Sequence, residues 1–257
     1  MTYRPTARDF NALFRGKIYG NHDIFTARSY ADLVRRHDID LSRAISTFED
    51  GTLVGTIVFA QRGERAWLSL MGVRPELRRQ GHGKRLFGAA VDAVRAAGAR
   101  SIEFEVVQKN VHAIAMYRSF GFPIVDELLV WARKPVPSAS DDLTFRTYRE
   151  DAILRVARSP STCWQREPRG VARARKLALV QCKGAYAFVR LRDDNAVLLD
   201  AGAEDERAAR ALVAELDRRV PYDITLVNEP AGSALSLAFA AAGWRIANRQ
   251  HRMLALA

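Results

Sequence analysis

The chain has 257 residues, 48% of them hydrophobic and 27% charged, which supports one large core or two smaller ones and excludes a disordered or fibrous protein. Its longest weakly polar stretch, residues 233–244, is shorter than the roughly 20 residues of a membrane span, and the charged N-terminus does not resemble a secretory signal. We therefore expect a cytoplasmic protein without membrane contact. Cys163 and Cys182 form no disulfide framework or metal-binding pattern, so no metal is expected.

The net charge of +11 favours an anionic partner, such as nucleic acid, an acidic membrane surface or a phosphorylated cofactor. The positive excess is spread over both halves of the chain, and no polybasic run occurs. A nucleic-acid interface is therefore disfavoured, and a solvated arginine-rich surface explains most of the charge.

The first half predicts a strand-rich segment followed by alternating helices and strands. The hairpin signal Glu-Asp-Gly joins the first two β-rich runs, and Gly98 ends the first periodic helix. The expected elements are strands at residues 43–48, 53–60 and 66–73, a helix at 84–97, a strand at 101–107, a helix at 111–120 and a strand at 124–132. The first three strands predict an antiparallel meander.

The second half predicts a similar order of elements after a seam at residues 133–142, which contains two prolines and two serines. We therefore expect two domains, at residues 1–135 and 141–257. The expected elements are strands at residues 177–182, 185–192 and 196–200, a helix at 206–220, a strand at 223–227 and a helix at 233–242. Gly121 and Gly243, which each end a helix, lie 122 residues apart, so an internal duplication is the economical explanation.

One segment carries a pattern for anion binding. Residues 78–84, with the sequence Arg-Arg-Gln-Gly-His-Gly-Lys, lie between a predicted strand and a predicted helix, where backbone N–H groups and the positive end of a helix dipole meet. Two glycines let the main chain approach phosphate oxygens closely, and three basic residues add positive charge. The spacing matches neither the mononucleotide nor the dinucleotide phosphate-binding signature.

Two motifs in order give this loop its context. The segment at residues 70–83, Leu-Met-Gly-Val-Arg-Pro-Glu-Leu-Arg-Arg-Gln-Gly-His-Gly, and a second at residues 104–122 resemble the signature regions of the GNAT superfamily of acyl-CoA-dependent acyltransferases. Arg78, Gly81 and Gly83 match that family's pyrophosphate motif. Residues matching the second motif are Asn110, Ala113, Tyr117, Gly121 and Phe122. The close resemblance covers residues 43–132, and residues 1–42 are assigned to the family's N-terminal helices by position alone.

The resemblance implies a fold and a cofactor site. The expected fold class is mixed α/β, in two tandem GNAT-like domains that each have a mostly antiparallel sheet flanked by helices. It further implies that the pantetheine arm of acetyl-CoA pairs with a strand that bulges and splays from its neighbour, and Met71-Gly72 is the expected bulge. The expected cofactor-binding residues are Met71, Val73, Arg78, Arg79, Gln80, Gly81, His82, Gly83, Lys84, Asn110 and Tyr117.

Acyl transfer to an amine needs a base, because an alkylamine with a pKa of about 10 is mostly protonated at neutral pH, and an acid for the leaving thiolate. Strand periodicity places Glu103 and Glu105 on one face, so either carboxylate is a candidate, as is a chain of water molecules. Resemblance to ribosomal-protein N-terminal acetyltransferases favours Glu105, and the spacing of twelve residues to Tyr117 fits the acid of those enzymes. His82 and His112 receive no catalytic role, and His112 is expected to point away from the face of Asn110 and Tyr117.

The second half lacks the motif residues. When the second half is aligned with the first at an offset of 122 residues, the loop at residues 78–83 aligns with residues 200–205, Asp-Ala-Gly-Ala-Glu-Asp. The acidic groups of this segment would repel pyrophosphate. Asn110 and Tyr117 fall on Gly232 and Phe239, which offer neither an amide nor a phenol. We therefore expect a degenerate GNAT-like domain without a carrier site.

These observations predict an N-acetyltransferase that moves the acetyl group of acetyl-CoA to a primary amine by direct attack. The acceptor is expected to be a small-molecule or peptide amine, since no recognition signature marks a particular one. The alternative is a module that senses coenzyme A or binds nucleic acid without transferring a group.

Overall fold

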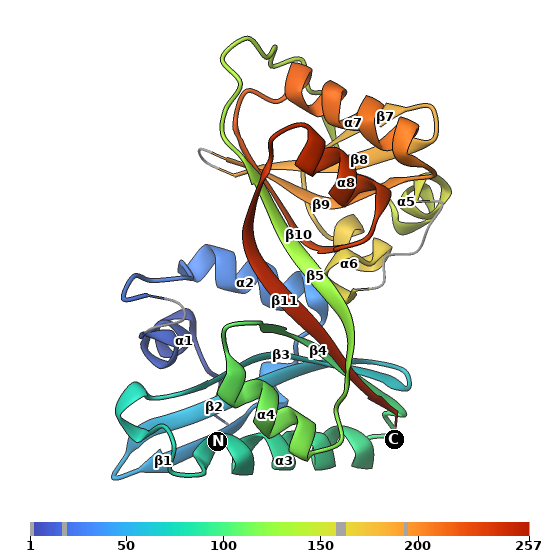
Figure 1. The fold of residues 1–257 in the computed structure, drawn as a ribbon. Coiled ribbons are helices and arrows are strands. Elements are labelled where there is room, and N and C mark those ends of the chain that lie inside the picture. Colours follow the sequence, from blue (N-terminus) through green and yellow to red (C-terminus); the bar gives the residue numbers. More distant parts are fainter. Residues whose placement is uncertain (1–2, 17–19, 158–162, 193–194, 257) are drawn as a thin grey trace. The chain divides into compact units, whose positions relative to one another are not determined.

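The computed structural model describes residues 3–16, 20–157, 163–192 and 195–256. It divides into two compact units, which are described separately (Figure 1). Unit 1 contains residues 1–125 and 251–257, and unit 2 contains residues 126–250. The proline-containing seam at residues 133–142 therefore lies within unit 2, and the units divide ten residues earlier than the composition predicts.

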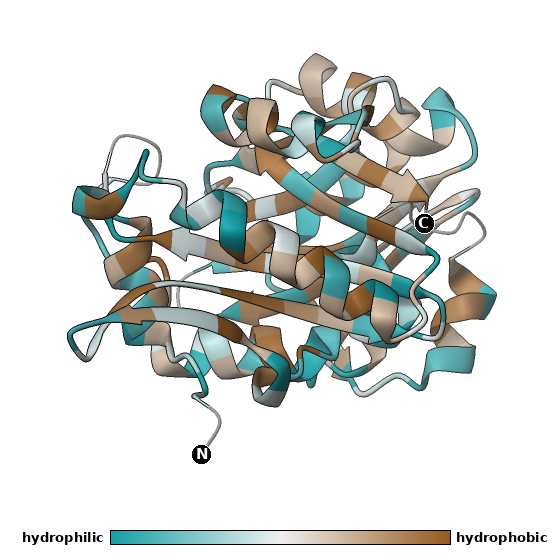
Figure 2. Ribbon diagram, turned by 90° about the horizontal axis from the view of Figure 1, so that it is seen from below, coloured by the Kyte–Doolittle hydropathy of each residue, from teal (hydrophilic) through white to brown (hydrophobic). Residues whose placement is uncertain are grey.

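Unit 1 is built on a mixed sheet with the expected antiparallel meander. In strand order the sheet runs β1, β2, β3, β4 and then the C-terminal part of β11. The strands are β1 (Ile45–Glu49), β2 (Thr52–Arg62), β3 (Arg65–Val73), β4 (Ser101–Val107) and the unit 1 part of β11 (Arg245–Leu256). Hydrophobic residues follow one another along the strands (Figure 2). The mixed, mostly antiparallel sheet confirms the predicted fold class.

Strands β3 and β4 separate after a short parallel pairing. Paired residues run from Arg65 opposite Ser101 to Trp67 opposite Glu103, and no pairing follows. We call the remaining parts of these strands, residues 68–73 and 104–107, the β3–β4 divergence. The resemblance to the GNAT family predicted that this strand separates from its neighbour, and the structure contains this separation.

The bulge in β3 lies at a different residue from the one expected. Met71 and Gly72 pair in regular register with Ile57 and Thr56, whereas the register shifts at Ser69, between the pairs formed by Leu68 and Leu70. Gly72 is needed for packing instead, because a Cβ atom there would lie 2.6 Å from Cβ of Leu13 in the N-terminal helix. The expected bulge at Met71-Gly72 is therefore wrong, since an isolated glycine in a strand marks a close approach as well as a bulge.

Among the described residues of unit 1, four α-helices flank the sheet. They are α1 (Ala7–Phe14), α2 (Ala27–His37), α3 (His82–Ala96) and α4 (Val111–Ser119). Thr6 and Thr26 begin α1 and α2 with capping boxes, in which each threonine side chain accepts from the backbone N–H three residues on. The aromatic rings of Phe87 and Phe104 pack at a centroid distance of 5.5 Å and join α3 to β4. This contact places α3 on the face of β4 that carries Phe104.

The last strand, β11, is absent from the sequence prediction. Its residues up to Gln250 belong to unit 2, and its residues from His251 belong to unit 1. Met253 and Ala255 are buried in the core of unit 1 together with Ile102 and Phe104. The first half of the chain therefore obtains part of its core from the C-terminal residues.

Unit 2 repeats the helix and strand order of unit 1. The sheet runs β5, β10, β9, β8, β7 and β6. Its elements are β5 (Ile124–Arg133), β6 (Phe145–Arg146), α5 (Glu150–Val156), α6 (Pro168–Ala172), β7 (Leu177–Cys182), β8 (Ala185–Arg192), β9 (Asn195–Ala203), α7 (Glu206–Arg219), β10 (Asp223–Pro230) and α8 (Ala234–Ala241). No helix in the part of the chain that is described is both long and apolar enough to cross a membrane.

Candidate active site

A cavity of about 770 Å³ opens beside the β3–β4 divergence in unit 1. It is bounded by the end of β3, the N-termini of α3 and α4, and the end of α1. Its lining residues are Leu13, Phe14, Met71, Gly72, Val73, Arg78, Arg79, Gly81, Gly83, Lys84, Lys109, Asn110, Val111, His112, Ala113, Ala115, Met116 and Tyr117. The structure thus brings the two sequence motifs together around one cavity. Of the expected cofactor-binding residues, Gln80 and His82 are outside this lining.

The N-terminus of α3 is open to an anion. Gly81 precedes the helix in a left-handed conformation, with φ of 84°, and no side chain caps the first turn. Arg79 is also left-handed, with φ of 69°, so the loop bends twice within three residues. Backbone N–H groups without an intrahelical partner carry the positive end of the helix dipole, and Lys84 and Lys109 line the same cavity. This end of the cavity is suited to a phosphate-containing ligand.

Arg78 has a structural contact that the sequence did not predict. Its guanidinium donates to the carbonyl oxygens of Leu13 and Arg15, each at 2.8 Å, and to that of Val73 at 3.1 Å. These bonds hold the end of α1 against the loop. The bonds also bring Leu13 and Phe14 to the cavity wall, which Arg78 itself lines, so its expected role in supplying charge to pyrophosphate stays a prediction.

His82 is buried and is not among the residues that line the cavity. Its Nδ1 atom lies 2.9 Å from the guanidinium of Arg85, and its Nε2 atom lies 3.6 Å from the carboxylate of Glu49. As the first residue of α3 it brings its backbone, not its imidazole, to the anion-binding loop. His112 lies in the first turn of α4 and is among the residues that line the cavity, and the direction of its side chain relative to Asn110 and Tyr117 stays a prediction.

Tyr117 and Asn110 lie on α4, where the cavity meets the sheet. The Asn110 side chain accepts from the backbone N–H of Ala113 at 3.4 Å and caps the helix. The Tyr117 ring packs against Phe87 and Phe104, with centroid distances of 4.6 and 4.5 Å. These contacts fix the ring on the α3 and α4 face of the sheet while the residue still lines the cavity.

Glu105 lies on the other face of β4. Side chains alternate along a strand, so Glu105 and Phe104 point to opposite faces. Oε2 of Glu105 accepts a hydrogen bond of 2.9 Å from Nε1 of Trp67. Glu105 does not line the cavity. Glu105 and Tyr117, the two expected catalytic residues, thus lie on opposite faces of the sheet, and their catalytic roles stay a prediction.

Glu103, the alternative base, is engaged in ion pairs. Its carboxylate lies 2.6 Å from the guanidinium of Arg65 and 3.1 Å from that of Arg252, and the residue is only 3% exposed. Each oxygen of this carboxylate accepts from one of the two guanidinium groups, whereas Glu105 accepts from a neutral indole. Which of the two carboxylates is the base stays a prediction.

The indole of Trp67 is held in place by a neutral histidine. The rings of Trp67 and His37 meet edge to face at a centroid distance of 5.5 Å, and both residues are buried. Burial, followed by the positive charges of Arg36 and Arg62, lowers the pKa of His37 to about 3. His37 is therefore uncharged at neutral pH, and its ring packs against the indole as a neutral group.

The loop that connects the third strand to the following helix is much shorter in unit 2 than in unit 1. Strand β9 continues to Ala203 and α7 begins at Glu206, so only two residues connect them, whereas eight residues connect β3 to α3. Asp200, which the ungapped comparison aligned with Arg78, is a buried strand residue. The expected acidic replacement of the loop is therefore wrong, since the equivalent loop is missing.

The N-terminus of α7 is also closed by its own side chain. The carboxylate of Asp205 accepts from the backbone N–H of Ala208 at 2.7 Å. In unit 1 the corresponding position is Gly81, which has no side chain to cap α3. Unit 2 therefore lacks both the loop and the open helix end that form the anion-binding part of the cavity in unit 1.

The sequence motifs did not identify the cavity residues that lie outside them. Leu13 and Phe14 belong to α1, which carries no family signature, and Lys109 and Met116 lie beside motif residues without belonging to the motif. Met116 lies three residues after the motif residue Ala113, a helical spacing that could have identified it, but only the packing of α4 shows that both residues border the cavity.

Residues 12–122 match the model of the acetyltransferase (GNAT) family. A solved structure of a proposed acetyltransferase from Pyrococcus horikoshii is 14% identical, with a TM-score of 0.70 over 99% of this chain and 88% of that chain. A GCN5-related N-acetyltransferase from Sphaerobacter thermophilus is 14% identical, with a TM-score of 0.58 over 84% and 82% of the two chains. For Eis1 from Mycobacterium abscessus the identity is 16% and the TM-score 0.56, over 96% of this chain and 69% of that one. At these identities the solved structures show the shared fold, and the family match shows a GNAT acetyltransferase domain at residues 12–122 of this chain.

Proposed function

We propose that the chain is an N-acetyltransferase that uses acetyl-CoA and a primary amine. The observation that carries the proposal is the cavity of unit 1, which extends from the uncapped N-terminus of α3 to Tyr117 beside the β3–β4 divergence. Gly81, Gly83 and Lys84 would hold the pyrophosphate at the helix end. The pantetheine arm would follow Met71 and Val73, whose main chain has no β4 partner.

The proposed chemistry is a direct attack of the amine on the thioester carbonyl. Glu105 removes a proton from the ammonium group, and the amine nitrogen then forms a bond to the carbonyl carbon. The carbon–sulfur bond breaks, and Tyr117 donates its phenolic proton to the departing thiolate. The products are the amide and coenzyme A. Placing the base and the acid on opposite faces of the sheet keeps the two proton transfers apart.

In the same proposal, unit 2 binds no acyl-CoA. The loop between β9 and α7 has two residues, and Asp205 caps the helix end that would have to bind phosphate. The residue that corresponds to Tyr117 in the duplication is Phe239, which is fully buried and has no hydroxyl group. Calorimetric titration is expected to give one equivalent of coenzyme A per chain, and two equivalents would refute this part of the proposal.

The experiment that tests the function is thiol release from acetyl-CoA with a panel of primary amines, measured for the wild type and for Tyr117→Phe. We expect Tyr117→Phe to lower kcat roughly 100-fold, because a positioned general acid contributes about 10²–10⁴-fold. The affinity for coenzyme A should change little, since the ring and its contacts with Phe87 and Phe104 are retained.

Tyr222→Phe is the matched control. Tyr222 donates to Asp141 at 2.6 Å within unit 2, so its removal should leave kcat unchanged. Wild-type turnover of Tyr117→Phe would disprove the acid role of Tyr117. Coenzyme A binding without thiol release for any amine would instead identify a module that senses the carrier without transferring its acyl group.

A further inference from the structure

We infer that Trp67 is a positioning residue for the base, a role that rests on the proposed function of Glu105. Trp67 is the last residue of β3 that pairs with β4, and Glu105 is two residues beyond the partner of Trp67. The 2.9 Å hydrogen bond from the indole to Glu105 therefore crosses from one strand to the other where they begin to separate.

A side chain that positions a carboxylate must itself have a fixed orientation, and the indole of Trp67 meets this condition. Trp67 is 2% exposed and packs against the buried ring of His37 on α2. The N–H group of an indole is a donor only, so it can hold one carboxylate oxygen but cannot take the proton of the acceptor amine. The bond holds Oε2 of Glu105 beside the last paired residue of β3, where β3 and β4 begin to separate.

The neighbours of this pair differ from it in charge. Glu103, on the same face of β4, is paired with Arg65 and Arg252, and the neutral His37 packs against Trp67. Trp67 contacts Glu105 directly, through Oε2.

Trp67→Phe tests the inference, because it removes the N–H donor and keeps an aromatic ring in the core. We expect kcat to fall roughly 10- to 100-fold, as for the loss of a hydrogen bond to a charged group, with the Kd for coenzyme A unchanged. The decisive measurement is a double-mutant cycle with Glu105→Gln. If Trp67 acts through Glu105, then Trp67→Phe should have no further effect on kcat in the Glu105→Gln background.

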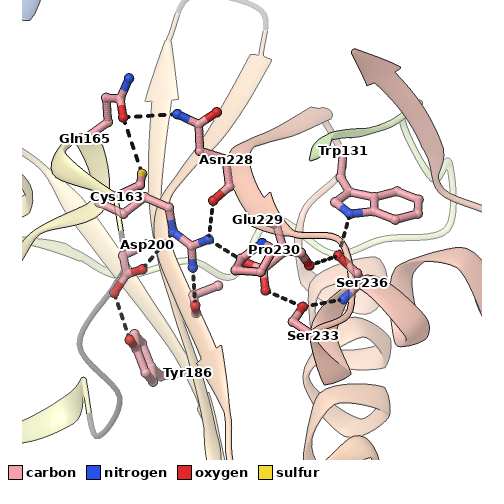
Figure 3. Close-up of polar contacts among 12 residues, drawn as sticks. Trp131, Cys163, Gln165, Tyr186, Asp200, Asn228, Glu229, Pro230, Ser233 and Ser236 are labelled. Carbon is pink, nitrogen blue, oxygen red and sulfur yellow. Dashed lines mark hydrogen bonds and ion pairs between the residues drawn. The ribbon is translucent and has the colours of Figure 1, made fainter. Parts of the chain in front are cut away.

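Trp131→Phe is the control, since it makes the same chemical change at an equally buried tryptophan. The indole of Trp131 donates to Oγ of Ser236 at 3.0 Å in unit 2, and we expect kcat to be unchanged (Figure 3). Additive losses in the cycle would overturn the positioning role and leave the proposed base intact. Full activity of Glu105→Gln would instead refute the base itself.

A separate observation in unit 2 carries a second inference: we propose that Arg166 closes the site that corresponds to the β3–β4 divergence. Strands β9 and β10 pair in parallel from Asn195 and Asp223 to Leu198 and Leu226 and then separate. The register of β9 shifts at Leu199, as that of β3 shifts at Ser69, so the same irregularity precedes both separations.

The guanidinium of Arg166 bonds to both strands beyond this point. On β9 it donates to the carboxylate of Asp200 at 3.0 Å and to the carbonyl of Ala201 at 2.6 Å. On β10 it donates to the carbonyl of Asn228 at 3.1 Å and to the carboxylate of Glu229. Arg166 is 4% exposed, and its donors therefore fill the position between the strands from within the protein.

Further hydrogen bonds hold the two carboxylates. The phenol of Tyr186 donates to Asp200 at 2.7 Å, and the hydroxyl of Ser233 donates to Glu229 at 2.5 Å (Figure 3). All four groups lie in unit 2. The guanidinium of Arg166 thus occupies the hydrogen-bonding groups of both strands, and both carboxylates that neutralise it are fully hydrogen-bonded. A pantetheine arm that bound here would have to displace the guanidinium.

Arg166→Ala tests the second inference. The variant leaves two buried carboxylates without their cation, and we expect the melting temperature to fall on the order of 10 °C. Millimolar guanidinium should restore part of this loss by entering the vacated position, beyond the effect of the same concentration of sodium ion. Arg166→Lys, which keeps the charge but lacks the planar fork, should melt between Arg166→Ala and the wild type.

Leu212→Ala serves as the control for rescue, because it removes an equally buried apolar side chain of unit 2 and offers guanidinium no carboxylate. An Arg166→Ala protein that melts as the wild type, or that guanidinium rescues no better than Leu212→Ala, would overturn the second inference.

Discussion

Glu105→Gln is expected to lower kcat/KM roughly 10²–10⁴-fold at neutral pH, because an amide cannot take the proton of an ammonium group. The substitution keeps the size of the side chain and leaves an oxygen that can accept from Trp67. Affinity for coenzyme A should be retained, since Glu105 does not line the cavity. The deficit should shrink as the pH approaches the amine pKa of about 10, where solvent supplies the free amine.

Glu103→Gln is the matched control on the same strand. It removes the charge that pairs with Arg65 and Arg252, so the melting temperature should fall while kcat is maintained. Steady-state kinetics from neutral to alkaline pH, combined with thermal melts, separate the two variants. A Glu103→Gln enzyme that loses activity like Glu105→Gln would show that the wrong carboxylate has been assigned.

A chain that ends after Gln250 is expected to lose the folded state of unit 1. This truncation removes Met253 and Ala255 from the core and removes the Arg252 partner of buried Glu103. Truncating one buried methionine to alanine costs about 2–5 kcal/mol, and a whole domain is stable by only about 5–15 kcal/mol. Circular dichroism and thiol-release assays should show a poorly folded and inactive protein, although the segment from residue 12 to residue 122 is intact.

Two point variants of β11 provide the comparison. Met253→Ala removes a fully buried side chain and should destabilise unit 1, whereas Leu256→Ala alters a residue that is 77% exposed and should have little effect. Normal melting and activity of the truncated chain would show that β11 is dispensable for unit 1. The same result would favour the domain boundary predicted from composition.

Local sequence patterns determined most of the elements near the site. Runs of β-forming residues predicted β2, β3 and β4, and helical spacing predicted α3, because both patterns follow from the geometry of one chain segment. The glycines at positions 81 and 83 predicted the open turn before α3 for the same reason, since a left-handed bend is a local property. The lack of the motif residues in the second half was also visible in the sequence.

Partners distant in sequence required the tertiary structure. The pattern Glu-Phe-Glu placed both carboxylates on one face, but only the packed strands show Glu103 bonded to two arginines and Glu105 to Trp67. Arg78 carries the motif charge, yet its guanidinium bonds to α1, whose end lies more than 60 residues away in sequence. The deletion of the loop in unit 2 was hidden because a fixed offset cannot detect a change in loop length.

The sequence by itself determined the family motif, the positions of most strands and helices, and the two residues proposed for proton transfer. Only the tertiary structure decided which carboxylate is engaged in ion pairs, which residues line the cavity, and that the C-terminal residues complete the core of unit 1. The physical reason is that periodicity reports the conformation of a single segment. Ion pairs, strand order and core contacts depend on long-range packing, which no single segment encodes.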